Sequence, residues 1–441
     1  MALWNFFSPI LPFVDEGARP AIRRAFEKAR IVGNFAIVQG LVQIIGFCSG
    51  ILIVRTLDQR DYAWFTIANT MQGTINVLAD IGISVGLISI GGRVWQDRHR
   101  FGQLVTTALT LRKMFGGIVV VIGMPILYFL LARNGSSLQY AALLIGLVVV
   151  ALLFQLSVNV LSVVPRLRSD IVRIQTIDFT AAIARLLALI AFMFVFLNAA
   201  LALALAAGAS LLQFAMLRSY AARVIDFNVS ENAEDRAAML GYVRKLAANA
   251  VFFSLQGQIT VYLISLFARH ATSVAELGAL ARLAMIFAVL GNVLTNVFVP
   301  AFARAQSPRR LRWLYAGIAG GVIAFGSVVL VAAALFPEQF LFVLGNKYAH
   351  LHRELLLMVG AAVLSSVTAT FWELNASRGW VAGSWLYIPL TLTTQIALIP
   401  FIDFTAVAGV LTFNLLSTVP NLLLNLVLSC RGFGSLQSAP A

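Results

Sequence analysis

Long apolar runs follow one another from residue 34 almost to the end of this 441-residue chain. A helix needs about 20 apolar residues to cross the hydrocarbon core of a bilayer, and these runs repeatedly reach that length. Hydrophobic residues make up 60% of the sequence and charged residues only 11%, against roughly 25% charged in a soluble domain. Such a chain cannot cover its apolar side chains with polar surface in water. We therefore predict an all-α integral membrane protein.

The apolar runs divide into about twelve predicted transmembrane helices. In chain order these spans cover residues 34–54, 62–90, 114–132, 138–161, 174–197, 199–217, 246–267, 276–302, 314–335, 355–376, 384–402 and 405–429. A single helix over 174–217 would measure about 66 Å, roughly twice the hydrocarbon thickness. The chain is therefore expected to reverse near Asn198, and Asp403, helped by Pro400, is expected to mark the same kind of reversal between the last two spans.

The basic residues gather on one side of this arrangement. Of the 32 Lys and Arg residues, 24 fall on the side of the N-terminus, with Arg112 placed in the loop after the second span. Six fall on the opposite side, and Arg185 and Arg282 lie inside spans. The positive-inside rule then predicts that both termini are cytoplasmic. The asymmetry also explains most of the net charge of +14 without nucleic acid as a partner.

A long polar stretch divides the spans into two groups of six. Two equal halves are typical of transporters built from structural repeats, with a binding site where the repeats meet. We expect an N-terminal lobe at 31–218 and a C-terminal lobe at 246–430, joined by a cytoplasmic inter-lobe loop at 219–245. An arm at 1–30 with a short interfacial helix precedes the lobes, and a cytoplasmic tail at 431–441 follows them.

Two charges lie inside the fifth predicted span, IDFTAAIARLLALI (177–190). An ionisable residue at the centre of a spanning helix costs on the order of 2.5–3.5 kcal/mol, so it usually faces a cavity or a partner. Asp178 and Arg185 are seven positions apart and share one face of the helix. One interpretation is an internal ion pair that neutralises both groups. The other is a face that lines an aqueous cavity, where Arg185 meets an anion.

Three further charged residues are candidate functional groups. Arg282 in the eighth span and Arg55 at the outer end of the first span either bind substrate or extend to the membrane interface. Asp80 either pairs at a helix bend beside Gly82 or couples transport to an ion, and Asp178 is a second candidate for ion coupling.

The seventh span carries several uncharged polar residues, among them Asn249 and Gln256. Hydrogen bonds between helices are one explanation for them. Contact with a hydroxyl-rich substrate is the other, provided that the span lines a central cleft. Near the end of the tenth span, Glu373 and Arg378 are most simply a surface pair.

Several classes of function lack their sequence signatures here. No phosphate-binding loop, nucleotide-binding domain or catalytic constellation is present, so neither an enzyme nor an ATP-driven pump on this chain alone is expected. Cys48 and Cys430 are too far apart in sequence to suggest a disulfide framework or a metal site. No metal or other cofactor is expected.

Five segments resemble, in the same order along the chain, the polysaccharide flippases of the Wzx type. These segments are ILIVRTLDQRDYAWFTIANTMQG (51–73), INVLADIGISVGLISIGGR (75–93), LGALARLAMI (277–286), FPEQFLFVLGNKYAH (336–350) and LNASRGW (374–380). The stretch Asp61-Tyr62-Ala63 departs from the family pattern because it lacks the usual glycine.

The resemblance implies the multidrug, oligosaccharidyl-lipid and polysaccharide exporter superfamily, whose members have two six-helix lobes around a cavity that opens alternately to each side. It implies a flippase in the bacterial cytoplasmic (inner) membrane that moves a polyprenyl-pyrophosphate-linked oligosaccharide to the outer leaflet for exopolysaccharide or O-antigen assembly. Membrane lipid, a glycan polymerase and glycosyltransferases would be its partners, and Arg185 is the best candidate for the pyrophosphate.

Two other functions stay open. The first is an ion-coupled multidrug or metabolite antiporter of the same superfamily, in which Asp80 and Asp178 would supply carboxylates to the cavity. The second is a non-transporting membrane subunit of a glycan-assembly complex.

Overall fold

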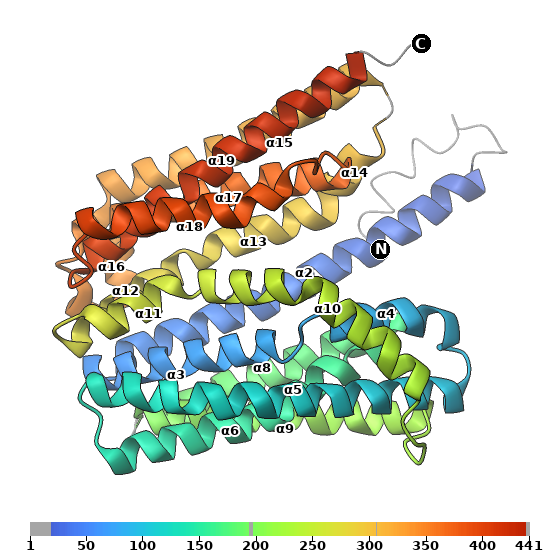
Figure 1. The fold of residues 1–441 in the computed structure, drawn as a ribbon, viewed down its shortest axis with the longest axis horizontal. Coiled ribbons are helices and arrows are strands. Elements are labelled where there is room, and N and C mark those ends of the chain that lie inside the picture. The colour runs from blue at the N-terminus through green and yellow to red at the C-terminus, as the bar shows by residue number, and fades with distance from the viewer. Residues whose placement is uncertain (1–18, 194–196, 306, 438–441) are drawn as a thin grey trace.

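The chain forms a bundle of long helices that run along one axis in the computed structural model (Figure 1). The structure describes residues 19–193, 197–305 and 307–437, and no strand occurs within these ranges. Nine of their helices are long and apolar enough to cross a membrane, and eleven spans result if each of two bent pairs counts as one. The chain is therefore a multi-pass membrane protein, although the predicted count of twelve is not confirmed.

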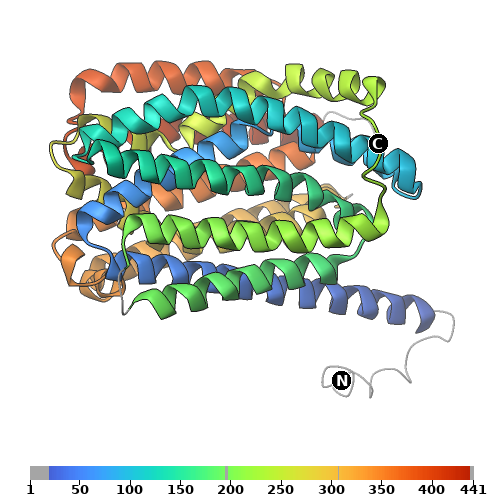
Figure 2. The same cartoon turned by 90° about the horizontal axis from the view of Figure 1, so that it is seen from below.

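The first group of helices corresponds to the predicted N-terminal lobe. It consists of α2 (Arg19–Thr56), α3 (Gln59–Leu78), α4 (Ile83–Val94), α5 (Arg98–Arg133), α6 (Leu138–Leu161), the short α7 (Val163–Leu167), α8 (Ile171–Met193) and α9 (Ala199–Val224). Figure 2 shows several of these helices side by side along the long axis. The packing runs from α2 to α8, then to α9, α6, α5 and α3.

The second group corresponds to the predicted C-terminal lobe. Its elements are α10 (Ala233–Gln256), α11 (Ile259–Phe267), α12 (Ala271–Leu283), α13 (Met285–Val293), α14 (Val299–Ala303), α15 (Pro308–Leu335), α16 (Pro337–Leu344), α17 (His352–Ser377), α18 (Tyr387–Leu398) and α19 (Val407–Gln437). Here α17 packs against α15 and α19, and α18 packs against α19. The predicted eleventh span corresponds to α18 and the short 3₁₀ turns on each side of it, which is too little helix to qualify as a span by length.

Breaks in the helices fall where local chemistry permits them. Between α3 and α4 the axis bends by 45°, and Gly82 adopts φ of 83°, a left-handed conformation that glycine takes without a steric penalty. Between α10 and α11 the axis bends by 53° at Gly257. A π-helical turn, Leu294–Phe298, connects α13 to α14 just before Pro300, which has no N–H to donate to a regular helix.

Apart from α10, which packs along α3, α4 and α5, the two groups of helices meet at one end of the molecule and diverge toward the other (Figure 1). At the closed end, Lys347 Nζ donates to the carbonyl of Leu57 at 2.7 Å, and Asn134 Nδ2 donates to the carbonyl of Ser265 at 2.9 Å. Arg55 donates to the carbonyl of Phe342. We call these contacts the seam. The start of α2 and the end of α19 both lie at the opposite end of the bundle.

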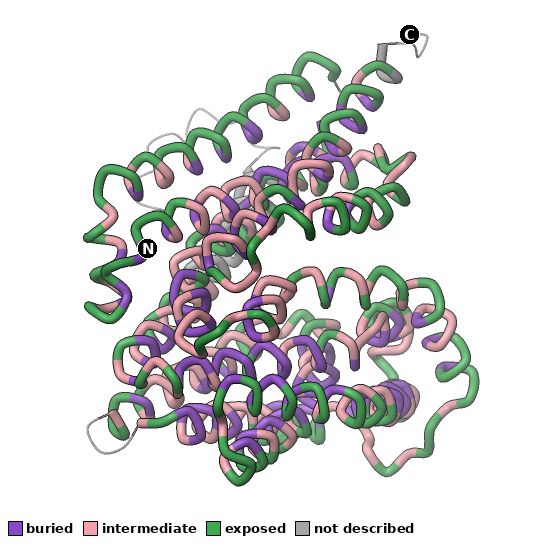
Figure 3. Tube along the Cα trace, turned by 60° about the vertical axis from the view of Figure 1, so that its left-hand side comes forward, coloured by how far each residue is buried: buried purple, intermediate pink, exposed green. Residues whose placement is uncertain are grey.

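Burial is concentrated between the helices, and the outward faces are exposed (Figure 3). Many of the exposed side chains are large and apolar. Val121 on α5 and Leu153 on α6 are 73% and 60% exposed. In water such surfaces would drive aggregation, whereas in a bilayer they contact lipid chains.

Both predicted reversals of the chain, near Asn198 and near Asp403, are confirmed. Asn198 caps α9 by accepting from the N–H of Leu201 at 2.8 Å. Asp403 stands in the turn before α19, where hydrogen bonds from Thr405 hold the pKa of its carboxyl below the usual range.

The expected inter-lobe loop shortens to 225–232, because α9 continues to Val224 and α10 begins at Ala233. The expected interfacial helix is part of α2, which begins at Arg19. The rest of the predicted arm, residues 1–18, and residues 438–441 of the tail lie outside the described residues.

Candidate functional site

Two arginines lie on helices that flank α2, close to where the two groups of helices meet. Arg185 is on α8 and Arg282 is on α12, and both helices pack against α2. The side chain of Arg282 crosses α2 at Gly50, where a Cβ would stand 3.3 Å from its Cδ and Nη1 atoms. Glycine at position 50 thus leaves the room that the guanidinium occupies. Arg282 Nε makes one long hydrogen bond, 3.5 Å, to the hydroxyl of Tyr62.

Arg185 has no hydrogen-bond or ion-pair partner within the part of the chain that the structure describes, and its Nε is buried. The charged group that acts on it is Arg282, another cation. Two like charges in a poorly solvated place repel each other, and each has lost hydration. An anion between them would offset both costs, so this arrangement is suited to bind one.

Asp178 does not neutralise Arg185. The structure shows no ion pair between these two described residues, and Gln213 on α9 instead donates its Nε2 to Asp178 Oδ1 at 2.8 Å. Of the two interpretations of this helix face, the geometry therefore favours a face on which Arg185 is available to a ligand.

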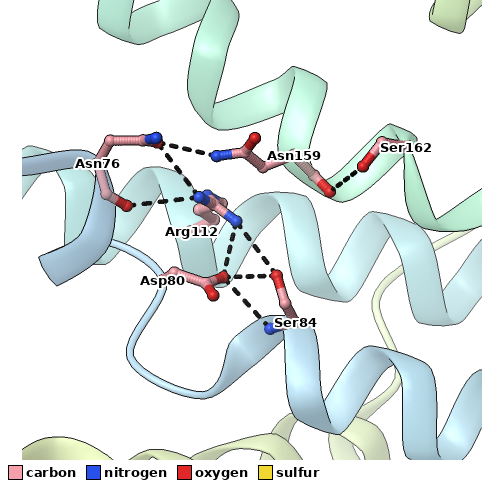
Figure 4. Close-up of polar contacts among 6 residues, drawn as sticks. All are labelled: Asn76, Asp80, Ser84, Arg112, Asn159 and Ser162. Carbon is pink, nitrogen blue, oxygen red and sulfur yellow. Dashed lines mark hydrogen bonds and ion pairs between the residues drawn. The ribbon is translucent and has the colours of Figure 1, made fainter. Parts of the chain in front are cut away.

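Asp80 belongs to a partly buried network at the bend between α3 and α4 (Figure 4). Arg112 Nη1 donates to Asp80 Oδ1 at 2.7 Å, and Ser84 Oγ donates to the same oxygen at 2.7 Å. Arg112 Nη2 also donates to Asn76 Oδ1 at 3.3 Å. The network matches one of the two interpretations of Asp80 from the sequence, namely pairing at a helix bend.

The placement of Arg112 in a loop is wrong. Arg112 is on α5, a helix of 36 residues that begins at Arg98, and it is only 2% exposed. A cation with a carboxylate partner can remain inside the bundle, so its presence in the sequence did not mark the end of a helix.

A cavity of about 790 Å³ with a mixed polar and apolar lining lies inside the second group, between α10, α11, α17, α18 and α19. None of the described residues that line it is charged. Asn249 and Gln256, both predicted from the sequence, are among them. Gln256 Oε1 accepts from Gln395 Nε2 on α18 at 3.0 Å, so part of its polar capacity is used between helices.

Helix α19 contributes a polar stripe that the sequence reading missed. The stripe consists of Asn414, Ser417, Thr418, Asn421 and Asn425, all of which line the cavity. Their spacing of three and four residues along an otherwise apolar span places them on one helix face, and this spacing was the available signal.

Aromatic side chains complete the wall of the cavity. Trp372 and Trp385 line it and are 39% and 74% exposed. Phe253 and Tyr387 also line it, with ring centroids 5.1 Å apart. The cavity therefore combines flat apolar faces with uncharged hydrogen-bonding groups, a composition typical of sites for small organic ligands.

The other predicted charged residues do not line the cavity and, in the part of the chain that the structure describes, form no hydrogen bond with either arginine. Arg55 stands in the seam, where its guanidinium is also 5.1 Å from the centroid of the Phe342 ring. Glu373 accepts from Thr295 Oγ1 at 2.8 Å, whereas Arg378 donates to the carbonyl of Ala303, so the expected pair of Glu373 with Arg378 is wrong. No cluster of three or more potential metal ligands occurs in the described ranges.

No protein-family model matches the chain, and no curated protein matches it. Solved structures do match. One is an inward-facing conformation of a multidrug resistance MATE family transporter of the MOP superfamily, with a TM-score of 0.63 and 16% identity over 92% of this chain and 100% of that one. Another is the lipid II flippase MurJ in an inward closed conformation, with a TM-score of 0.70 and 10% identity over 90% of this chain and 88% of that one.

A third similar structure is a MOP superfamily transporter from Pyrococcus furiosus Vc1, whose description notes a reverse polarity of its binding pocket. Its TM-score is 0.54 and its identity 15%, over 92% of this chain and 95% of that one. At such identities the likeness concerns the fold, and the chain has the fold of these transporters.

Proposed function

We propose that this chain is a flippase of the MOP superfamily that moves a polyprenyl-pyrophosphate-linked oligosaccharide across the membrane by alternating access. The observation that carries the proposal is Arg185, which is partly buried, has a buried Nε without a partner among the described residues and is repelled by the charge of Arg282. A ligand with several negative charges compensates these two positive charges better than a neutral or cationic ligand does.

The chemistry of the two arginines fits a pyrophosphate. A guanidinium offers several N–H donors in a planar fork that matches phosphate oxygens, and it stays charged when it is buried. Each cation would gain a counter-ion, and the repulsion between them would be compensated in the bound state alone. The substrate would thereby supply the negative counter-charge for the two arginines.

The shape of the bundle supports a transport cycle. The seam closes one end of the space between the lobes, and we place that end toward the outer leaflet. A headgroup would enter from the cytoplasmic side, and rocking of the lobes would break the seam and release the headgroup outward. Two of the similar structures are described as inward-facing and inward closed conformations of transporters.

The surroundings follow from the substrate. A lipid-linked oligosaccharide is assembled by glycosyltransferases at the cytoplasmic face of a bacterial inner membrane and is consumed by a polymerase at the outer face. The chain would work between these enzymes, with lipid as its other partner and without a catalytic step of its own.

Substitutions at Arg185 test the anion site. We expect Arg185→Ala to abolish surface glycan export at normal protein levels, and Arg185→Lys to retain part of it, because lysine keeps the charge and loses the fork. Arg310→Ala, an exposed residue at the start of α15, is the control and should export normally. A double variant, Asp178→Asn with Arg185→Gln, that exports normally would contradict the proposal.

The orientation has its own test. Reporter fusions at Ser230 and Pro308 should report the cytoplasm, and fusions at Ser136 and Tyr348 the outer side. A reversed signal at any of the four would overturn the placement of both termini in the cytoplasm.

A multidrug or metabolite antiporter is the second candidate. The observation in its favour is the aromatic lining of the cavity, since Trp385 and Tyr387 could face an organic cation. An antiporter would extrude a cationic dye such as ethidium from reconstituted vesicles in exchange for an ion, whereas the flippase would not.

A further inference from the structure

We propose that the uncharged cavity of the second lobe binds sugar residues of the substrate, apart from the arginines that would hold the pyrophosphate. The inference rests on the proposed function and deepens it. It divides the headgroup between two places, an anion site beside α2 and a neutral site between α10, α17, α18 and α19.

The lining of the cavity excludes several ligand classes. A phosphate would need a cation, and an organic cation would be held best by a carboxylate, but none of the described lining residues carries either charge. A monovalent metal ion could use amide and hydroxyl oxygens, but about 790 Å³ is in the size range of sites for organic ligands. A neutral molecule with many hydroxyl groups remains.

Unsatisfied acceptors indicate what that molecule must supply. Asn421 donates its Nδ2 to Thr391 Oγ1 at 2.8 Å, and Asn425 donates its Nδ2 to the carbonyl of Asn421 at 2.9 Å. These bonds orient both amides. Each Oδ1, like Ser417 Oγ, lacks a partner among the described residues and has almost no accessible surface, so the cavity wall must move slightly before a ligand hydroxyl reaches it. An orphaned acceptor costs free energy until a donor reaches it. Sugar hydroxyls are donors, whereas ionised phosphate oxygens are not.

The aromatic residues can pack against the apolar face of a sugar ring. A pyranose has a face of C–H groups that packs against a flat aromatic surface while its hydroxyls point sideways to polar partners. Trp372 and Trp385 offer such surfaces on α17 and just before α18, and the amides of α19 line the same cavity.

The two sites lie on connected helices. Helix α12, which carries Arg282, packs against α17 and α19, and both of these line the cavity. One extended headgroup can therefore engage both sites, with its phosphates toward α2 and its sugars inside the second lobe.

The experiment measures binding of two probes to the full chain in nanodiscs. One probe is a polyprenyl pyrophosphate without sugar, and the other is the lipid-linked oligosaccharide pool extracted from the membranes of the source organism. We expect the wild type to bind the second probe at least tenfold more tightly than the first. The double variant Trp385→Ala with Thr418→Val should bring this ratio close to one and leave affinity for the sugar-free probe unchanged.

A matched control uses the same two substitutions outside the cavity. Trp313 on α15 is 78% exposed, like Trp385, and Thr412 on α19 donates to the carbonyl four residues before it, as Thr418 does. The variant Trp313→Ala with Thr412→Val should keep the full ratio, and Arg185→Ala should weaken binding of both probes.

The outcomes separate the two proposals. A wild type that binds both probes equally, or a cavity variant that keeps the ratio, overturns the sugar site and leaves the flippase intact. Failure of the wild type to bind either probe overturns both. If sodium ions restored the ratio of the two affinities in the cavity variant, the cavity would be assigned to a cation instead.

Discussion

The fifth helices of the two lobes occupy corresponding places in chain order, yet they differ in chemistry. In the first lobe α8 has 23 residues and carries Asp178 and Arg185. In the second lobe α18 has 12 residues and no charge, and its buried polar groups are Thr391 and Gln395. Two lobes with the same order of helices can therefore differ in the chemistry of corresponding helices. Here one helix presents charged side chains, and the other presents neutral hydrogen-bonding groups.

The two lobes also differ in how their polar groups are satisfied. In the first lobe Asp80, Ser84, Asn76 and Arg112 bind one another, and among the described atoms of this network only Arg112 Nε is buried without a partner, so the network is largely closed. In the second lobe the stripe on α19 leaves acceptors without partners among the described residues, next to a cavity. A closed network holds helices in place, whereas an open one is available to a ligand.

The largest effect is expected from Arg112→Leu, which would test how much the closed network contributes. Removing one partner of a buried ion pair costs about 3–5 kcal/mol, and we expect the lower end because Asp80 is 30% exposed. Thermal unfolding in detergent measures the loss. Adding Asp80→Asn should recover part of it, and exposed Arg223→Leu should change the free energy of unfolding by less than about 0.5 kcal/mol. An unaffected Arg112→Leu variant would show that the first lobe does not depend on its ion pair.

A smaller loss is expected from Asn375→Leu, the equivalent break among neutral groups of the second lobe. Asn375 Nδ2 donates to the carbonyl of Asn425 at 2.9 Å, and its Oδ1 accepts from Ser429 Oγ at 2.8 Å. Orphaning such partners costs about 1–3 kcal/mol, checked by the same unfolding measurement. A loss as large as that of Arg112→Leu would erase the contrast between the lobes.

The smallest effect is expected where the lobes meet. Lys347→Met removes an exposed cation from the end of α2, so stability should fall by less than about 1 kcal/mol. The seam should nevertheless open more often. In a background without Cys48 and Cys430, a cysteine introduced at Ser265 should react several-fold faster with a maleimide. Arg353→Met, an exposed neighbour, should leave that rate unchanged, and an unchanged rate in Lys347→Met would indicate that the seam does not depend on this lysine.

The bundle could be predicted because lipid imposes length on apolar runs. Every predicted span has helix at its place, and the reversals at Asn198 and Asp403 are confirmed. Hydropathy reports only the part of a helix that lies in lipid, so it could not show that α2 begins at Arg19 or that α5 begins at Arg98. A polar helix end outside the bilayer looks like a loop in such a profile.

The sites were harder to predict because a side chain's partner is set by packing. Arg112 is close in space to Asp80 but 32 positions away in sequence, so no local pattern marks the pair. Asn249 and Gln256 stood out in a span already suspected of facing a cleft. Asn421 and Asn425 were missed because neutral amides are tolerated in many spans, and only the positions of α17 and α18 reveal the cavity beside them.

The seam also constrains the order in which the protein is made. Lys347 and its acceptor Leu57 are 290 residues apart, and at about 5–20 residues per second a ribosome needs roughly 15–60 s to synthesise that length. During this interval the first lobe stands in the bilayer without its partner. Its buried arginine must find a counter-charge within the part already synthesised, and Asp80 precedes Arg112 on the growing chain. The contacts of the seam are therefore among the last that biosynthesis permits, and the first lobe has to persist in lipid before they form.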